Sequence, residues 1–279
     1  GYLETVGRAY NNLAIALPVE EHERILECYE KGYELARKVG AVHNISHIGN
    51  NLAFQYFAMG NFNKALRIVE ESVALDKKTG NMLNLCFSLG WTGAAQYLFG
   101  EWDKSEETFK EVLSLSQRIN NVQGIAGCYE WLGYLHFDKE EYAKAWEHFE
   151  KSREVYEKAR FKYRQMSASR DLIATSIELG ELEKAKNLLD TFQEFALQVK
   201  DKDLIANADA LRGMLFRAQK KWKESIEYFE KSLQEHEAIG ARKWNVYRLA
   251  KAVLYEYARV YLERDQKGDR EKAHNLLNQ

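Results

Sequence analysis

The sequence predicts an all-α chain built from a repeated pair of antiparallel helices, and three observations carry this prediction. A short block of sequence recurs every 40 residues, the segments between the blocks show helical hydrophobic periodicity, and proline is nearly absent. Pro18 is the one proline in 279 residues, and scarcity of proline favours long helices because proline breaks helix interiors. A single helix pair cannot bury both its faces, so the pairs should stack into an α-solenoid.

The recurring block ends in a small residue. It reads "MGNFNKA", "FGEWDKS", "KEEYAKA", "LGELEKA" and "QKKWKES", and it ends at Ala65, Ser105, Ala145, Ala185 and Ser225. A further copy, "KGDREKA", ends at Ala273, 48 residues after the fifth, with the extra residues within 241–267. We therefore expect one solenoid domain over 1–279, with repeats at about 1–40, 41–80, 81–120, 121–160, 161–200, 201–240 and an incomplete 241–279.

A second set of residues runs in phase with the blocks and marks the connections between repeats. Its members are Gly40, Gly80, Asn120, Arg160, Lys200 and Gly240. Glycine and asparagine most readily adopt the left-handed conformation that closes a helix. Arg160 and Lys200 do not share that property, so we expect their two connections to close differently.

A third set lies 12 residues before the end of each block: Ala53, Gly93, Gly133, Ile173 and Gly213. Small residues recurring in pairs indicate a close crossing of two helices, and Ile173 predicts looser or shifted packing in the fifth repeat. In the second repeat the two helices are expected near 42–59 and 61–79. Ala65, Val69 and Val73 form the apolar stripe of the latter helix.

These markers resemble the tetratricopeptide repeat. The second repeat carries that family's pattern at Leu52, Ala53, Tyr56, Gly60, Phe62, Ala65 and Val69. The match covers about 240 residues in five clear repeats, with a first repeat that slips by one residue and a divergent last one. The family's common period is about 34 residues, with proline after the second helix. The 40-residue period here is similar to the long repeats of Pins-type polarity adaptors, Rap-type peptide-sensing phosphatases and the sensor arm of MalT-type regulators.

The resemblance implies a right-handed superhelix of about six to seven repeats, with a concave groove lined by the first helix of each repeat. It assigns to the groove the positions six and three residues before, and one and four after, each small residue of that helix. Candidate peptide-binding residues at these positions are Asn11, His47, Asn50, Phe54, Phe57, Phe87, Tyr97, Glu130, Tyr134, Phe137, Arg170, Asn207 and Arg217.

Three features of this set suggest a ligand. Aromatic residues gather in the middle of the array and are typical anchors for a peptide or helix, although they could equally pack between repeats. Arg170 and Arg217 could orient an acidic ligand. Asn50, the first residue of the pair in "GNNLA", should face the groove, where its amide could clamp a peptide backbone or bond within its own turn. Asn51 is expected to be structural.

Composition argues against several other classes of protein. The net charge is −2, and no basic stripe indicates nucleic acid or an anionic membrane as the partner. No apolar run approaches the roughly 18 residues of a membrane span, and the N-terminus lacks the features of a signal peptide. Cys28, Cys86 and Cys128 form no CxxC motif, so free, buried thiols in a reducing compartment are expected.

Sequence motifs for catalysis or for a cofactor are absent. There is no glycine-rich phosphate loop and no HExxH, and no cofactor is expected. His43 and His47 share a helix face, but no third metal ligand is evident.

The leading hypothesis is a non-catalytic, cytoplasmic scaffold that binds a protein segment or peptide in its groove. A narrower form makes it the regulatory arm of a larger signalling protein, because the chain lacks a start methionine and its last helix is short. RNA binding is the alternative, an enzyme is the third class, and self-association stays open.

Overall fold

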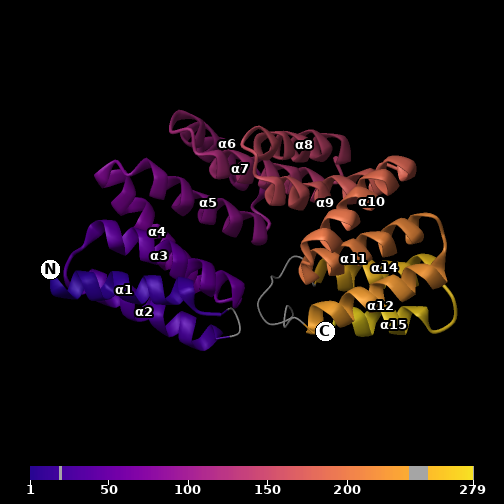
Figure 1. Cartoon of the computed structure of the whole chain (residues 1–279), viewed down its shortest axis with the longest axis horizontal. Helices are drawn as coiled ribbons and strands as arrows, with labels where there is room; N and C mark the ends of the chain where they lie inside the picture. The colour runs from indigo at the N-terminus through magenta and orange to yellow at the C-terminus, as the bar shows by residue number, and fades with distance from the viewer. Residues whose placement is uncertain (19–20, 239–250, 279) are drawn as a thin grey trace. The chain divides into compact units, whose positions relative to one another are not determined.

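The structure of the chain, a computed structural model, describes residues 1–18, 21–238 and 251–278 (Figure 1). These residues form α-helices and no strand, which confirms the all-α prediction. The helices are α1 (Tyr2–Ala16), α2 (His22–Lys38), α3 (Val42–Ala58), α4 (Phe62–Thr79), α5 (Met82–Leu98), α6 (Trp102–Arg118), α7 (Val122–Asp138), α8 (Tyr142–Lys158), α9 (Lys162–Glu178), α10 (Leu182–Val199), α11 (Lys202–Ala218), α12 (Trp222–Ala238), α14 (Lys251–Arg264) and α15 (Asp269–Leu277).

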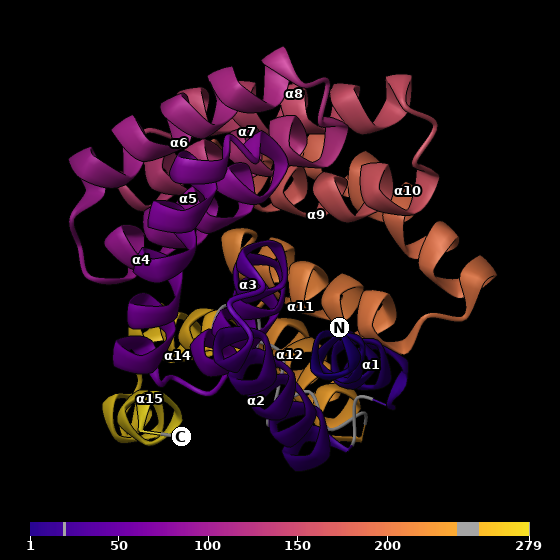
Figure 2. The same cartoon turned by 90° about the vertical axis from the view of Figure 1, so that its left-hand side faces the viewer.

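The helices group into two compact units, Gly1–Leu135 (unit 1) and His136–Gln279 (unit 2). We call the first helix of each repeat the A helix and the second the B helix. In unit 1 the A helices α1, α3 and α5 are neighbours, and each packs on its own B helix, α2, α4 or α6 (Figures 1 and 2). In unit 2 the A helices α9, α11 and α14 are related in the same way, with B helices α10, α12 and α15. This is the predicted stack of helix pairs, and the expectation of one domain stays a prediction.

The turns follow one rule throughout the 40-residue repeats, including the two connections expected to differ. A residue with left-handed backbone occurs every 20 residues, at Gly40, Gly60, Gly80, Gly100, Asn120, Glu140, Arg160, Gly180, Lys200 and Lys220. Arg160 and Lys200 have φ of 61° and 55°, and the residue after each donates its N–H to the carbonyl five positions earlier, as in the glycine turns. The prediction that these two close differently is wrong, because helix packing outweighs the local preference of the residue. Gly240 lies outside the described residues.

The crossing of A and B helices is fixed by matched side-chain volumes. A Cβ atom added at Gly93 would lie 2.9 Å from the Phe109 ring, and one at Gly213 would lie 3.0 Å from the Phe229 ring. Both rings are fully buried, so neither can yield easily. At the same crossings Ser105 and Ser225 each donate a hydroxyl hydrogen bond to the glycine carbonyl at 2.8 Å.

Ile173 occupies the small-residue position of the fifth repeat and is itself fully buried. Leu189 lies where the third, fourth and sixth repeats have phenylalanine, and both Ile173 and Leu189 belong to the continuous apolar core of unit 2. A smaller side chain on the B helix therefore accompanies the larger one on the A helix. In unit 1 the cysteines are buried free thiols, as expected.

A buried carboxylate lies between α3, α4 and α5. Asp76 is 1% exposed, and its Oδ2 accepts hydrogen bonds from Ser46 Oγ at 2.7 Å and Ser88 Oγ at 3.0 Å. Burial raises its pKa, against the opposite effects of the two hydroxyls and of His43. Its place in the last turn of α4, near the negative end of the helix dipole, acts in the same direction as burial.

The crossing of α5 and α6 predicts opposite effects on stability for alanine substitutions at two glycines of α5. Gly90→Ala should stabilise the protein by up to about 1 kcal/mol, because alanine favours helix and nothing lies within 4 Å of the new Cβ. Gly93→Ala should be less stable than Gly90→Ala by about 1–3 kcal/mol, because it presses on Phe109. Thermal unfolding measures both, at about 2–4 °C per kcal/mol. Adding Phe109→Val, which copies the pair Ala53 and Val69, should reduce the cost of Gly93→Ala; equal costs in both backgrounds would refute the matched crossing.

The raised pKa of Asp76 predicts a pH-dependent effect of Asp76→Asn. The asparagine carbonyl can accept both serine hydroxyls, while ionised Asp76 carries a buried charge that costs stability at neutral pH. Because the pKa is raised on folding, the wild type gains stability relative to the variant as pH falls towards the pKa of a free carboxyl. Thermal unfolding from pH 7.5 to 4 should show the variant's advantage shrinking. A wild type that instead loses ground on acidification would contradict the raised pKa.

Candidate functional site

The A helices of unit 1 carry most of the candidate residues on one face, which we call the A face. The repeat register places Asn11 and Asn50, which are 39 residues apart, at one level of α1 and α3. It places His47 and Phe87, which are 40 residues apart, at another level of α3 and α5. Both asparagines are buried, at 4% and 7% exposure, whereas His47 and Phe87 are exposed.

The asparagine pairs join neighbouring repeats. Asn51 Nδ2 donates to Asn11 Oδ1 at 2.9 Å, and Asn11 Nδ2 lies 3.4 Å from Asn12 Oδ1. Asn51 is therefore structural, as expected, and it holds the side chain of Asn11 in place. Asn50 Oδ1 lies 3.0 Å from Ser88 Oγ and shares its single hydroxyl hydrogen with Asp76 Oδ2, which links Asn50 to the polar group around Asp76. Within the described residues Asn50 Nδ2 has no partner.

Aromatic side chains form a partly exposed surface on α3 and α5. Phe54 and Phe87 are 47% and 45% exposed, whereas Phe57 is buried. Trp91 lies beneath this surface, with its ring 5.5 Å from that of Phe54 and stacked 5.4 Å from that of Phe57. The sequence predictions missed Trp91, although it and Trp131 are 40 residues apart and could have been found by that spacing.

Trp131 has the same role one repeat later. Its ring is 5.5 Å from Tyr97 and 5.9 Å from Tyr134, edge to face, and stacks on the core residue Phe109 at 5.4 Å. Tyr97, Glu130 and Tyr134 are all half-buried. The aromatic candidates of unit 1 thus form two tryptophan-centred groups, of which the first is the more open.

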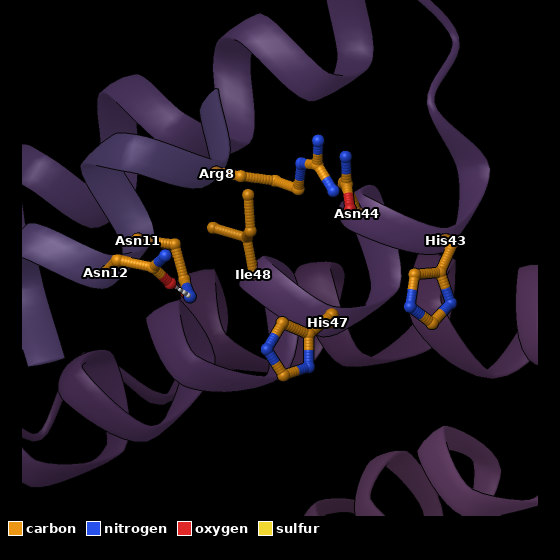
Figure 3. A pocket seen from close by; sticks show the side chains of 7 residues that line it. All are labelled: Arg8, Asn11, Asn12, His43, Asn44, His47 and Ile48. Carbon is orange, nitrogen blue, oxygen red and sulfur yellow. Dashed lines mark hydrogen bonds between the residues drawn. The ribbon is translucent and has the colours of Figure 1, made fainter. Parts of the chain in front are cut away.

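A hollow of about 190 Å³ lies between α1 and α3, lined by Arg8, Asn11, Asn12, His43, Asn44, His47 and Ile48 (Figure 3). Figure 3 shows the Arg8 side chain reaching from α1 towards the amide of Asn44 on α3. We call it the α1–α3 hollow. It brings together two predicted groove residues, Asn11 and His47, with Arg8, which the same rule assigns to the groove as the residue six before the small residue Ala14 of the first repeat. The other residues of the hollow were not among the predicted groove positions.

The candidates of unit 2 are engaged by their own chain. Phe137 contacts Tyr142 edge to face at 5.2 Å, and Arg170 pairs with the adjacent Asp171 at 3.2 Å. Asn207 is 3% exposed and donates to the Asp203 carbonyl at 2.7 Å.

Arg217 is 5% exposed and lies in a network of carboxylates. It pairs with Glu178 of α9 at 2.7 Å and with two residues of α14, Glu256 at 3.2 Å and Glu263 at 2.5 Å. Arg259 of α14 pairs with the same three carboxylates. Burial raises the pKa of Glu256, against the attraction of the two arginines. The charge of Arg217 is thus neutralised within the protein.

A serine, a histidine and an aspartate lie together in unit 2 without forming a catalytic triad. Ser232 Oγ donates to the Ala206 carbonyl at 2.7 Å, and His236 Nδ1 lies 2.9 Å from the Ser232 carbonyl. Asp203 Oδ1 is 3.8 Å from His236 Nε2, and Ser232 and His236 are at most 1% exposed. His236 Nδ1 also lies 3.3 Å from Ser232 Oγ, but both side chains are buried, so the hydroxyl has no access to a substrate.

His43 and His47 stack with their ring centroids 6.4 Å apart, and His43 Nδ1 is 3.1 Å from Asn81 Nδ2. Partial desolvation, and then the charge of His43, lower the pKa of His47. Among the described residues no group of three potential ligands could hold a metal ion. None of the described helices is long and apolar enough to cross a membrane.

Comparison with known proteins shows similarity at the level of structure. No family model matches the sequence, and no curated protein matches it. The apo form of RapI has a TM-score of 0.75 at 13% identity, covering 98% of this chain and 95% of RapI. The Rap conjugation gene regulator of plasmid pLS20, solved with the Phr* peptide, has a TM-score of 0.75 at 17% identity, covering 93% of this chain and 68% of the regulator.

A signal-transduction ATPase of the STAND class from Pyrococcus horikoshii, which has a tetratricopeptide-repeat sensor, has a TM-score of 0.64 at 15% identity. The alignment covers 98% of this chain and 42% of that protein, so the chain spans less than half of its length. Together with the 40-residue helix pairs, these similarities show that the chain has the tetratricopeptide-type helical-repeat fold of the Rap proteins.

Proposed function

We propose that the A face of unit 1 binds an extended peptide or protein segment. The observation that carries the proposal is the pair Phe54 and Phe87, nearly half exposed on neighbouring A helices, with the Trp91 ring 5.5 Å from that of Phe54. Burying one phenylalanine side chain contributes about 1.5–3 kcal/mol, so two such rings can anchor a ligand.

Polar groups beside these rings suit an extended backbone. Asn50 Nδ2 has no partner among the described residues, and it lies one helical turn before Phe54 on α3. A free amide N–H beside an aromatic anchor can bond a peptide carbonyl, while the ring takes a side chain. The bonded asparagines around it hold the surface in a fixed shape, which lowers the entropy lost on binding.

Two solved neighbours support this proposal. One Rap regulator was solved with the Phr* peptide and another Rap protein with the competence and sporulation factor. The similarity to a protein with a repeat sensor supports the narrower proposal, that the chain is the regulatory arm of a larger signalling protein. The concave groove of this chain and the binding roles of its individual residues are part of the proposal.

The proposal assigns binding, not catalysis, to this face. The candidate residues of unit 2 are less suited to binding a ligand, because Asn207 is buried and the charge of Arg217 is already neutralised by glutamates. RNA binding is the competing function and predicts salt-dependent affinity, since each phosphate contact releases counterions.

The proposal predicts that Phe54→Ala and Phe87→Ala weaken peptide binding without unfolding the protein. Peptides selected from a random decamer library on the whole chain should bind each variant about tenfold or more weakly, the loss expected from one buried ring. Phe161→Ala, at a ring 43% exposed in unit 2, is the matched control and should bind as the wild type does. Fluorescence anisotropy of the selected peptides gives the affinities.

Asn50→Ala should also weaken these peptides, and Tyr134→Ala should weaken those long enough to reach α7. The proposal fails if Phe54→Ala, Phe87→Ala and Asn50→Ala all bind the selected peptides as tightly as the wild type. Tight, salt-dependent binding of a single-stranded RNA, with no peptide selected, would favour the competing function.

A further inference from the structure

We propose that the α1–α3 hollow binds a carboxylate of the ligand, with Arg8 as its counter-ion. This inference rests on the proposed peptide-binding function and adds the chemistry and the direction of the bound segment. It follows from the donors that line the hollow, the charge left unbalanced there and the distance to the aromatic pair.

Arg8 is the cation of the hollow. It is exposed on α1, and within the described residues it forms no ion pair. Most ion pairs of unit 1 join two residues three or four positions apart in the sequence, as the pair of Lys31 and Glu27 does. A guanidinium presents a fork of N–H donors that matches the two oxygens of a carboxylate.

The remaining wall supplies neutral donors. Asn11, Asn12 and Asn44 contribute amides, and His43 and His47 contribute imidazoles from the same face of α3. The Asn81 amide nitrogen faces His43 Nδ1, which leaves the proton of a neutral His43 on Nε2. Ile48 is the one apolar residue of the wall, so the hollow suits a charged group attached to a short aliphatic stem.

The protein already places one of its own carboxylates at this wall. Asn44 Nδ2 donates to Glu4 Oε1 at 3.2 Å, and Glu4 precedes Arg8 by four residues on α1. Glu4 is therefore a competitor for the group that Arg8 and Asn44 would bind. Removing its charge should strengthen the binding of a ligand carboxylate, the opposite of what loss of a merely structural contact would do.

Size and charge limit the ligand group. A volume of about 190 Å³ is several times the roughly 30 Å³ of a water molecule but below the roughly 300 Å³ at which ligand pockets for whole small molecules begin. One end group fits. The single guanidinium of Arg8 balances a single negative charge, which favours a carboxylate over a doubly charged phosphate.

The position of the hollow gives the ligand a direction. His47 and Phe54 are seven residues apart on α3, which is about 10 Å along the helix. An extended segment covers that distance in about three residues. The favoured ligand therefore has an acidic group at α1 and a hydrophobic side chain about three residues away at Phe54.

Three matched tetrapeptides test the inference on the intact, ¹⁵N-labelled chain. Acetyl-Phe-Gly-Ser-Ala with a free C-terminus carries a terminal carboxylate, its C-terminal amide carries none, and acetyl-Phe-Gly-Ser-Asp-amide carries one on a side chain. Side-chain amide signals of Asn11 and Asn44 report binding. At least one acidic peptide should bind about tenfold tighter than the neutral amide, as expected for a charge-assisted hydrogen bond, and the stronger of the two identifies the source of the carboxylate.

Three variants complete the test. Arg8→Gln should remove the preference for the acidic peptide, and Arg67→Gln, an equal charge change at an exposed position of α4, should keep it. Glu4→Gln should tighten the acidic peptide several-fold and leave the neutral amide unchanged.

Equal binding of all three peptides, or a preference that survives Arg8→Gln, would overturn the carboxylate site. It would leave the aromatic anchors, and with them the proposed function, standing. A Glu4→Gln variant that binds the acidic peptide more weakly would also overturn the inference.

Discussion

The close crossing of each A helix over its B helix is the constraint on which the rest of the structure depends. At Gly93 a buried ring occupies the space of the missing side chain, and a serine hydroxyl of the B helix bonds the glycine carbonyl. Such a contact fixes how far the A helix is rotated about its own axis. Because side chains three and four residues apart share a helix face, this rotation also decides which residues of α3 and α5 point away from the core.

That rotation explains how the repeats can present different chemistry on a common frame. In unit 1 the outward positions hold exposed rings at Phe54 and Phe87, and donor groups around Arg8. In unit 2 the corresponding position at Arg217 is closed by three glutamates, two of them from α14. The frame thus carries a surface suited to a ligand in one unit and an internal ion network in the other.

The spacing of small residues was sufficient to predict the helix pairs, their order and the crossings, because packing repeats every 40 residues and leaves a regular trace in the sequence. The turns at Arg160 and Lys200 could not be predicted from residue type. Their left-handed backbone, at a cost of about 1–2 kcal/mol each, is imposed by the helices on both sides.

The candidate site was predictable in outline only. Register identified Phe54 and Phe87, but it could not distinguish them from Phe57, which Trp91 and its neighbours cover. Two of the three partners of Arg217 could not be recognised from the repeat spacing, because Glu256 and Glu263 lie within the irregular 48-residue step. Exposure depends on contacts between repeats, and a single-repeat pattern does not contain them.

The most direct test of the central claim is chemical-shift mapping of the intact, isotope-labelled chain with a library-selected peptide. The account predicts that the largest perturbations fall on outward residues of α1, α3 and α5, including Asn50, Phe54 and Phe87. Perturbations confined to the B helices, or to the network around Arg217, would contradict it.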